Sequence, residues 1–407
     1  LAGARLTTIE GIGSGPEKLH PVQRSFVLHG AVQCGFCTPG MVITATEFLA
    51  RQPHSDRSEM AGAISGNLCR CTGYSKILDA MENVAEEVVV PEHLPPPAPR
   101  ACSPAAASTA AGRAVFSPGS MAELWVILSD HPEARVFAGG TDLLIWLRGR
   151  RIDPPSLINL AKIETLRGIG EDSHWLRIGA GTSHAALLDD PRITTMFSVL
   201  SQALQTLGSP HIRRMGTIGG NIVTASPAGD TLPPLQVLDA EVELCSVAGM
   251  RRMVISDFIL APGKTALRPG EILTAVFLPK PADHVFQHFE KVGLRSAMAC
   301  AIASLAAVIG VSPDGRIESA RLAWGSVGPT VARIPAIEAA LIGETLSRKT
   351  LESVIPLVAT GISPLDDVRA STAYRRLVAG NLLLRLMKFA PPSAGMQAEG
   401  LPMEKSL

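Results

Sequence analysis

The sequence has no excess of either charge and no apolar segment long enough to span a membrane. Its 407 residues include 37 Lys or Arg and 37 Asp or Glu, scattered along the chain, which gives no basis for binding nucleic acid or an anionic lipid surface. The longest apolar run, Met298 to Val311, is too short for a bilayer and is interrupted by Ser304 and Gly310. We therefore expect no nucleic-acid partner and no membrane association, and we interpret this run as a buried strand.

Several common catalytic motifs are also missing. The chain has no Ser-His-Asp order, no H-E-x-x-H, no Walker lysine and no G-x-G-x-x-G. The stretch Gly11-Ile12-Gly13-Ser14-Gly15 lacks a glycine at the third required place and follows no convincing strand. His174, His184 and His211 stand alone, so surface or core roles suit them better than ligation. We predict no catalytic residue in this chain.

What the sequence does contain is a group of four cysteines in the pattern C-x2-C-x31-C-x-C. They are Cys34, Cys37, Cys69 and Cys71, with no histidine within three residues of any of them. Four thiolates suit a tetrahedral zinc or a [2Fe–2S] cluster. Structural zinc sites usually repeat C-x2–4-C or add histidines, and the C-x-C half here is tighter than that. The spacing favours the iron–sulfur cluster and leaves zinc as the alternative.

The remaining cysteines and the N-terminus indicate a reducing compartment. The chain has seven cysteines, an odd number, and no secretory signal at its start. Both observations argue against a disulfide framework. We expect a cytoplasmic location. Cys102 reads as a linker thiol, and Cys245 and Cys300 as small apolar core residues.

Composition divides the chain into five parts. Residues 1–90 read as a helical domain, with helices at 21–33, 38–51, 55–65 and 74–89, so that each cysteine pair lies in a loop before a helix. Residues 91–113 are rich in Pro, Ala and Ser and predict an extended linker. Mixed strands and helices follow over 114–283, a further strand-and-helix unit over 284–390, and a tail over 391–407.

Two glycine pairs in the mixed region suggest a dinucleotide site. Gly139-Gly140 follows a strand at 135–138 and precedes a helix at 143–148, and Gly219-Gly220 lies in a second loop. Such turns let backbone N–H groups approach a diphosphate. We expect the dinucleotide between two subdomains. A flavin would be the natural partner of an iron–sulfur cluster, because it exchanges one-electron for two-electron steps.

These motifs resemble those of the molybdenum hydroxylases, the xanthine dehydrogenase family. Residues 32–41 (VQCGFCTPGM) and 66–74 (GNLCRCTGY) are similar to the family's cluster segment. Residues 137–143 (FAGGTDL), 217–221 (TIGGN) and 225–230 (ASPAGD) are similar to its FAD domain. The resemblance implies a multidomain α+β chain: a helical [2Fe–2S]-binding bundle, a two-subdomain α/β FAD-binding domain, and a C-terminal α+β subdomain.

The resemblance also implies roles for individual residues. The four cysteines would bind the [2Fe–2S] cluster, and Gln33 would reach a molybdenum cofactor on a partner subunit. Leu273 and Lys291 would lie near the flavin. The other FAD contacts would be Val136, Phe137, Ala138, Gly139, Gly140, Thr141, Asp142 and Leu143 in the first loop, and Thr217, Gly219, Gly220, Asn221 and Asp230 around the second.

The function implied is electron transfer. Electrons from hydroxylation at molybdenum would pass through the cluster to FAD and then to NAD, in a complex of two small and two large subunits. The substrate could be a purine such as xanthine, an aldehyde, or a nicotinate-like heterocycle; a zinc-stabilised nucleotide-binding module is the alternative of a different class. The family's ferredoxin domain has no counterpart here, so we expect a truncated chain or a second chain that supplies that cluster. The segment after Lys291 lacks the acidic pair found in the animal enzymes.

Overall fold

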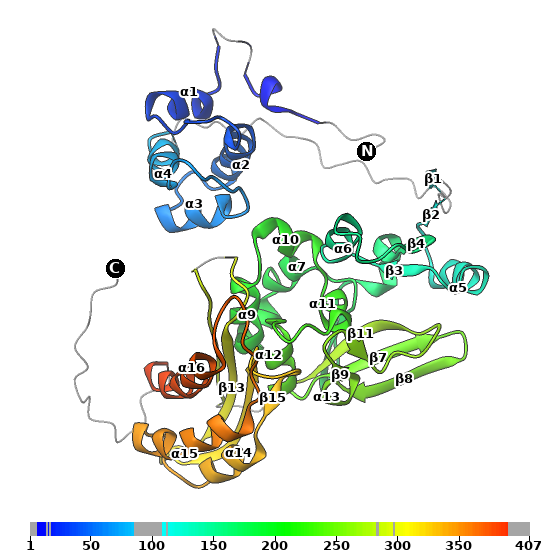
Figure 1. Cartoon of the computed structure of the whole chain (residues 1–407), viewed down its shortest axis with the longest axis vertical. Helices are drawn as coiled ribbons and strands as arrows, with labels where there is room; N and C mark the ends of the chain where they lie inside the picture. Colours follow the sequence, from blue (N-terminus) through cyan, green and yellow to red (C-terminus); the bar gives the residue numbers. More distant parts are fainter. Residues whose placement is uncertain are drawn as a thin grey trace. The chain divides into compact units, whose positions relative to one another are not determined.

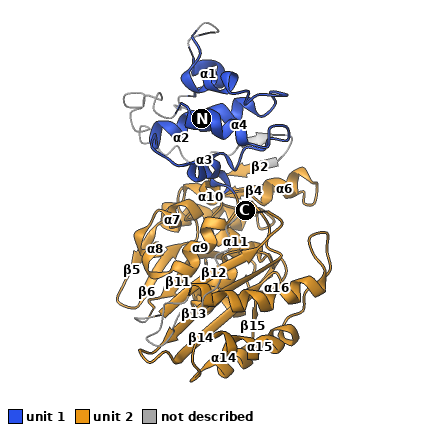
Figure 2. Ribbon diagram, turned by 90° about the vertical axis from the view of Figure 1, so that its left-hand side faces the viewer, with its two compact units in different colours: residues 1–103, 209–212 blue, residues 104–208, 213–407 orange. Residues whose placement is uncertain are grey.

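The computed structural model describes residues 6–13, 15, 18–84, 108–110, 113–281, 285–295 and 298–389. Cys102, the predicted tail and most of the predicted linker lie outside these residues. The chain forms two compact units, residues 1–103 with 209–212 and residues 104–208 with 213–407 (Figure 2). No helix within the described ranges is both long and apolar enough to cross a lipid bilayer.

The first unit contains four helices around a small apolar core (Figure 1). They are α1 (Pro21–Leu28), α2 (Thr38–Arg51), α3 (Arg57–Ile64) and α4 (Ser75–Glu82), preceded by the 3-10 turn η1 (Ile9–Gly11). Phe26, Met41 and Met81 are fully buried between them. Because α1 packs on α4 and α2 on α3, the two loops that carry the cysteines, α1–α2 and α3–α4, belong to one bundle.

The first helix is shorter than the sequence suggested. We expected it to reach residue 33, but it ends at Leu28. Gly30 adopts φ +61°, the N–H of Ala31 donates to the carbonyl of Phe26, and the N–H of Gly30 donates to that of Val27. This is a Schellman motif, which closes a helix at a glycine. The early end releases residues 29–37 to form the loop that holds the first cysteine pair.

The second unit begins with a small mixed sheet of order β1-β2-β4-β3. Its strands are β1 (Ser108–Ala110), β2 (Arg113–Phe116), β3 (Arg135–Phe137) and β4 (Ser156–Asn159), and β4 runs parallel to both β2 and β3. The helices α5 (Met121–Asp130) and α6 (Leu143–Arg148) make the crossovers. The first glycine pair lies where β3 ends, at the carboxyl edge of a parallel strand, where such sheets commonly bind ligands.

A five-stranded antiparallel sheet of order β5-β6-β11-β7-β8 follows. Its strands are β5 (Ile169–Glu171), β6 (Trp175–Gly179), β7 (Glu241–Ser246), β8 (Gly249–Val254) and β11 (Ile272–Pro279). Between β6 and β7 the chain forms α7 (His184–Leu188), α8 (Pro191–Met196), α9 (Ser198–Thr206), α10 (Pro210–Met215), α11 (Ile218–Thr224) and α12 (Leu232–Val237). The remaining short elements are η3 (Leu160–Lys162), η4 (Glu164–Leu166) and α13 (Ile255–Phe258), together with β9 (Ile259–Ala261) and β10 (Lys264–Thr265), which form a two-stranded sheet.

The C-terminal part is a second antiparallel sheet between two helical layers (Figure 1). It contains β12 (Val285–Val292), β13 (Ala303–Val311), β14 (Ile317–Gly325) and β15 (Ala332–Arg333), then α14 (Pro335–Leu341), α15 (Arg348–Gly361), α16 (Thr372–Arg385) and η5 (Leu386–Lys388). Along β13, Leu305 and Ala307 face the core under α14–α16, whereas Ala306 and Val308 face the core shared with α9 and α12. This alternation explains why the run reads as continuously apolar.

Three local expectations in this unit are wrong. The strand expected from Met298 begins at Ala303, after a segment in which Met298 has φ +53°. Cys300, expected in the core, is exposed, and Cys245 is only half-buried. In each case tertiary packing overrides a local pattern of apolar residues.

Candidate metal centre and dinucleotide site

The four cysteines of the first unit lie in two loops that meet. Cys37 immediately precedes α2, and Cys69 and Cys71 lie between α3 and α4. The Sγ atoms of Cys34 and Cys71 are 3.5 Å apart. Cys37 and Cys69 are also linked by a hydrogen bond between their side chains. Each pair therefore takes one sulfur from each loop.

This pairwise arrangement bears on the choice of metal. A structural zinc site holds four ligands around a single ion. A [2Fe–2S] cluster spreads four thiolates over two irons, two on each. The donor set therefore fits a binuclear cluster, with Cys34 and Cys71 able to hold one iron and Cys37 and Cys69 the other.

The two thiols of each pair have pKa values shifted in opposite directions. The backbone N–H of Phe36 lowers the pKa of Cys34, and the hydrogen bond with Cys34 raises the pKa of Cys71. The hydroxyl of Thr72 lowers the pKa of Cys69 to about 7, whereas burial raises the pKa of Cys37 to about 11. In each pair one thiol therefore has a lowered pKa and the other a raised pKa, and metal binding must displace the protons that remain.

The second unit contains a hollow at the glycine segments. It has a volume of about 460 Å³, within the usual range of small-molecule sites, and continues into a smaller hollow of about 140 Å³. The two share Ala138, Leu160, Gly181 and Thr217. Of the residues predicted from the sequence, those that line them are Val136, Phe137, Ala138, Gly139, Thr217, Gly219, Gly220 and Leu273.

The first glycine segment leaves its backbone donors free. Among the described residues, the N–H groups of Gly139, Gly140 and Thr141 have no hydrogen-bond partner. Gly140 adopts φ +72°, and a Cβ on Gly139 would lie 1.8 Å from the carbonyl oxygen of Met215. Only glycine permits the backbone at position 139 to approach the backbone of Met215 this closely. The free N–H groups of the loop are suited to an anion such as a diphosphate.

The second glycine segment differs from what we expected. It is the first turn of α11, capped by the Thr217 hydroxyl, which accepts from the N–H of Gly220 at 3.1 Å. The N–H of Gly219 donates to the carbonyl of Ala180 at 2.9 Å, and that of Ile218 to the carbonyl of Thr182 at 3.0 Å. These donors are already used by the protein. The segment therefore lines the hollow without offering these donors, whereas the N–H groups of the first loop are free.

Hydrogen bonds from the residues next to the loops hold the two segments together. The hydroxyl of Thr224 in α11 donates to Asp142 at 2.8 Å, which ties α11 to the first loop. Asn221 accepts from Thr231 at 2.5 Å. Neither Asp142 nor Asn221 lines the hollows, and nor do Gly140, Thr141 or Leu143. We interpret Asp142 and Asn221 as supports of the loop geometry.

Asp230 and Lys291 form a buried ion pair outside the hollows. Lys291 Nζ donates to Asp230 Oδ2 at 2.6 Å, to the carbonyl of Thr206 at 2.8 Å and to that of Ala299 at 3.1 Å. All three ammonium protons are used. Burial raises the pKa of Asp230, and Lys291 opposes that rise. Asp230 Oδ1 has no partner among the described residues, so it is the one oxygen of this pair that a bound group could engage.

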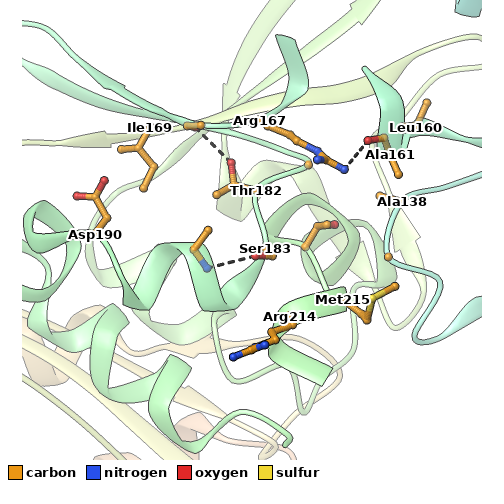
Figure 3. A pocket seen from close by; sticks show the side chains of 15 residues that line it. Ala138, Leu160, Ala161, Arg167, Ile169, Thr182, Ser183, Asp190, Arg214 and Met215 are labelled. Carbon is orange, nitrogen blue, oxygen red and sulfur yellow. Dashed lines mark hydrogen bonds between the residues drawn. The ribbon is translucent and has the colours of Figure 1, made fainter. Parts of the chain in front are cut away.

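A third segment of the hollow was not identified from the sequence. Gly181, Thr182 and Ser183 line it (Figure 3), immediately after β6 and before α7. Gly181-Thr182 repeats the Gly-Thr dipeptide of Gly140-Thr141 and Gly216-Thr217. This repetition is the sequence feature from which the third segment could have been identified.

Two arginines line the hollow and were also missed. Arg167 donates to the carbonyl of Ala161, as Figure 3 shows. Arg214 is exposed and has no hydrogen-bond or ion-pair partner within the described ranges. No spacing in the sequence distinguishes these two from the other arginines, because the turns of the backbone bring them to the hollow. Arg214 could supply positive charge to an anionic ligand.

Comparison with known proteins gives three matches along the chain. Residues 8–82 match the family described as "[2Fe-2S] binding domain", residues 108–281 "FAD binding domain in molybdopterin dehydrogenase", and residues 287–390 "CO dehydrogenase flavoprotein C-terminal domain". The putative xanthine dehydrogenase FAD-binding subunit XdhB of Escherichia coli is 31% identical over 68% of this chain and 95% of its own length. The chain belongs to the molybdenum hydroxylase family.

Other relatives extend the comparison. Aldehyde oxidase 2 of Cavia porcellus is 28% identical over 95% of this chain, which spans about a third (34%) of that protein. A structure of carbon monoxide dehydrogenase from Hydrogenophaga pseudoflava is 27% identical, with a TM-score of 0.65 over 68% of this chain and 96% of the matched chain. These matches confirm the expected multidomain α+β fold and an oxidoreductase component with [2Fe–2S] and FAD domains.

Proposed function

We propose that this chain is the electron-transfer subunit of a xanthine dehydrogenase-like molybdenum hydroxylase. Electrons would enter at a [2Fe–2S] cluster held by Cys34, Cys37, Cys69 and Cys71, and would leave through FAD to NAD. The observation that carries the proposal is the pairing of the four sulfurs across two loops, in the same chain as a glycine-lined hollow whose bordering loop, 139–141, has free N–H groups.

In the FAD site we assign tasks to the residues of this chain. The N–H groups of Gly139, Gly140 and Thr141 would bind the diphosphate, and Arg214 would add positive charge. Gly219, Gly220 and Leu273 would form the apolar wall that excludes water. Asp230 and Lys291, whose ion pair lies outside the hollows, would stand near the cofactor and support the segment after the second loop. FAD, when bound, supplies the exchange between one-electron and two-electron steps.

We further propose a partner subunit that carries the molybdenum cofactor, in a cytoplasmic complex of two copies of each. The surface around the cysteines supports this. Phe36 is 96% exposed and Leu68 is 68% exposed, each next to a cysteine, and Gln33 is also exposed. Exposed apolar side chains of this size beside a redox centre are typical of a protein interface. Gln33 would reach the molybdenum cofactor across it.

The substrate would be determined by that partner. We favour a purine of the xanthine type, because the bacterial relative XdhB is named for that activity and matches over 95% of its length. An aldehyde is the second candidate, since aldehyde oxidases match over 95% of this chain.

A reductive titration tests the proposed relay. The anaerobically purified chain should take up about three reducing equivalents from dithionite, one at the cluster and two at the flavin. Subsequent addition of NAD, compared with addition of oxygen, tests the acceptor. A chain that binds one zinc and takes up no electrons would contradict the relay and favour a nucleotide-binding module.

A further inference from the structure

The loop between Cys71 and α4 contains a hydroxyl that contacts a cysteine sulfur. Thr72 Oγ1 lies 3.1 Å from Cys69 Sγ. The same oxygen accepts a hydrogen bond from the backbone N–H of Tyr74, also at 3.1 Å. Among the described residues, no other hydroxyl is hydrogen-bonded to any of the four sulfurs. Thr72 therefore distinguishes Cys69 from the other three cysteines.

The direction of this hydrogen bond follows from the chemistry of the two groups. A threonine hydroxyl has one proton to donate and two lone pairs to accept with, and one lone pair is used by the Tyr74 N–H. A cysteine sulfur that binds iron is a thiolate and has no proton. The Thr72 hydroxyl must then be the donor and the sulfur the acceptor.

The surrounding backbone keeps the hydroxyl in this position. Tyr74 has φ +68°, an unusual conformation for a residue with a side chain. Its phenol accepts from the N–H of Cys69 at 2.9 Å and donates to the carbonyl of Asn67 at 3.3 Å. The Cys69 N–H is thus directed to the phenol and away from its own sulfur. Tyr74 thus holds the Thr72 hydroxyl beside the Cys69 sulfur, which the backbone N–H groups of Cys71 and Thr72 also approach.

We propose that Thr72 tunes the reduction potential of the cluster through its hydrogen bond to the Cys69 sulfur. This inference rests on the proposed function, because it requires a [2Fe–2S] cluster on the four cysteines. One-electron reduction would add one negative charge to a cluster that Cys69 ligates. A donor to a ligand sulfur stabilises the reduced state more than the oxidised state and raises the potential. Thr72 is a positioning and tuning residue and does not ligate the metal.

The test is a dithionite titration of the full chain, with the reduced cluster followed by electron paramagnetic resonance. In Thr72→Val, which keeps the shape but removes the hydroxyl, the ratio of reduced to oxidised cluster at a fixed potential should fall about tenfold. That corresponds to a midpoint about 59 mV lower for a one-electron couple. Thr72→Ser should restore the midpoint of the unmodified chain. Thr44→Val is the matched control, because the Thr44 hydroxyl bonds Asn67 in the same helical unit and no sulfur.

The outcomes separate the two claims. An unmodified chain without iron would overturn the proposed function itself. A Thr72→Val chain with a full cluster and an unchanged midpoint would overturn the tuning role alone. If the valine variant contains no iron, Thr72→Ala replaces it, since alanine removes the hydroxyl without a second γ-methyl group. If neither variant contains iron, Thr72 is required for assembly, and the tuning role is overturned.

Discussion

Replacing Cys69 with serine should lower the iron content of the purified chain from about two atoms to near zero. Cys69 pairs with Cys37, and together they would provide both thiolates of one iron. A serine hydroxyl stays protonated near neutral pH and is a much harder donor, so that iron would lose half of its protein ligands. Elemental analysis and the visible absorption of the cluster measure the loss.

The control for this variant is Cys300→Ser. Cys300 is an exposed free thiol in the other compact unit, so its replacement should leave iron and flavin unchanged. The Cys69→Ser chain should keep its flavin as well, because the glycine-lined hollow belongs to the second unit. An unchanged cluster spectrum in Cys69→Ser would contradict the ligand set.

Replacing Gly139 with alanine should lower the FAD bound per chain about tenfold or more. The new Cβ would lie 1.8 Å from the carbonyl oxygen of Met215 and 2.6 Å from its carbonyl carbon, and both are backbone atoms. Overpacking of this kind costs about 1–3 kcal/mol, and about 1.4 kcal/mol corresponds to a factor of ten in binding. The displaced loop is the one whose free N–H groups would bind the diphosphate. Flavin absorbance after gel filtration measures the occupancy.

Gly170→Ala is the matched control in the same unit. Gly170 lies in β5 beside the hollow without lining it, and a Cβ there would meet nothing within 4 Å. Its flavin content should equal that of the unmodified chain. Full flavin occupancy in Gly139→Ala would contradict the assignment of the diphosphate to the first loop.

The cysteine site could be predicted from the sequence largely because its signal is local. Two pairs with fixed spacing, each before a helix, were enough to propose a cluster between two loops. What spacing could not reveal is which cysteines pair. Cys34 meets Cys71 and Cys37 meets Cys69 because the two loops approach each other in opposite directions, which is a property of the bundle.

The dinucleotide site was only partly predictable, since its walls come from distant segments. The first loop, predicted to contact the diphosphate, has free backbone N–H groups, whereas the N–H groups of the second are bonded within the fold. The N–H of Gly219 donates to the carbonyl of Ala180, which directly precedes the third segment, and that segment was not predicted from the sequence. Whether a glycine N–H is free depends on what lies opposite, and no local pattern contains that information.

The partners of a charged residue, Lys291, likewise could not be predicted from a local sequence pattern. Lys291, predicted to lie near the flavin, donates its three ammonium protons to Asp230 and two carbonyl groups. Removing either charge would leave the other buried and unpaired, which is costly. The pair therefore connects α9, the segment before α12 and the segment after β12, a role that no sequence motif indicates.

The measurement that tests the central claim most directly is the content of iron, acid-labile sulfide, zinc and flavin in the purified chain. The account predicts about two irons, two sulfides and one FAD per chain, with no stoichiometric zinc. One zinc per chain with neither iron nor flavin would contradict it, and would make the four cysteines a structural site in a protein that transfers no electrons.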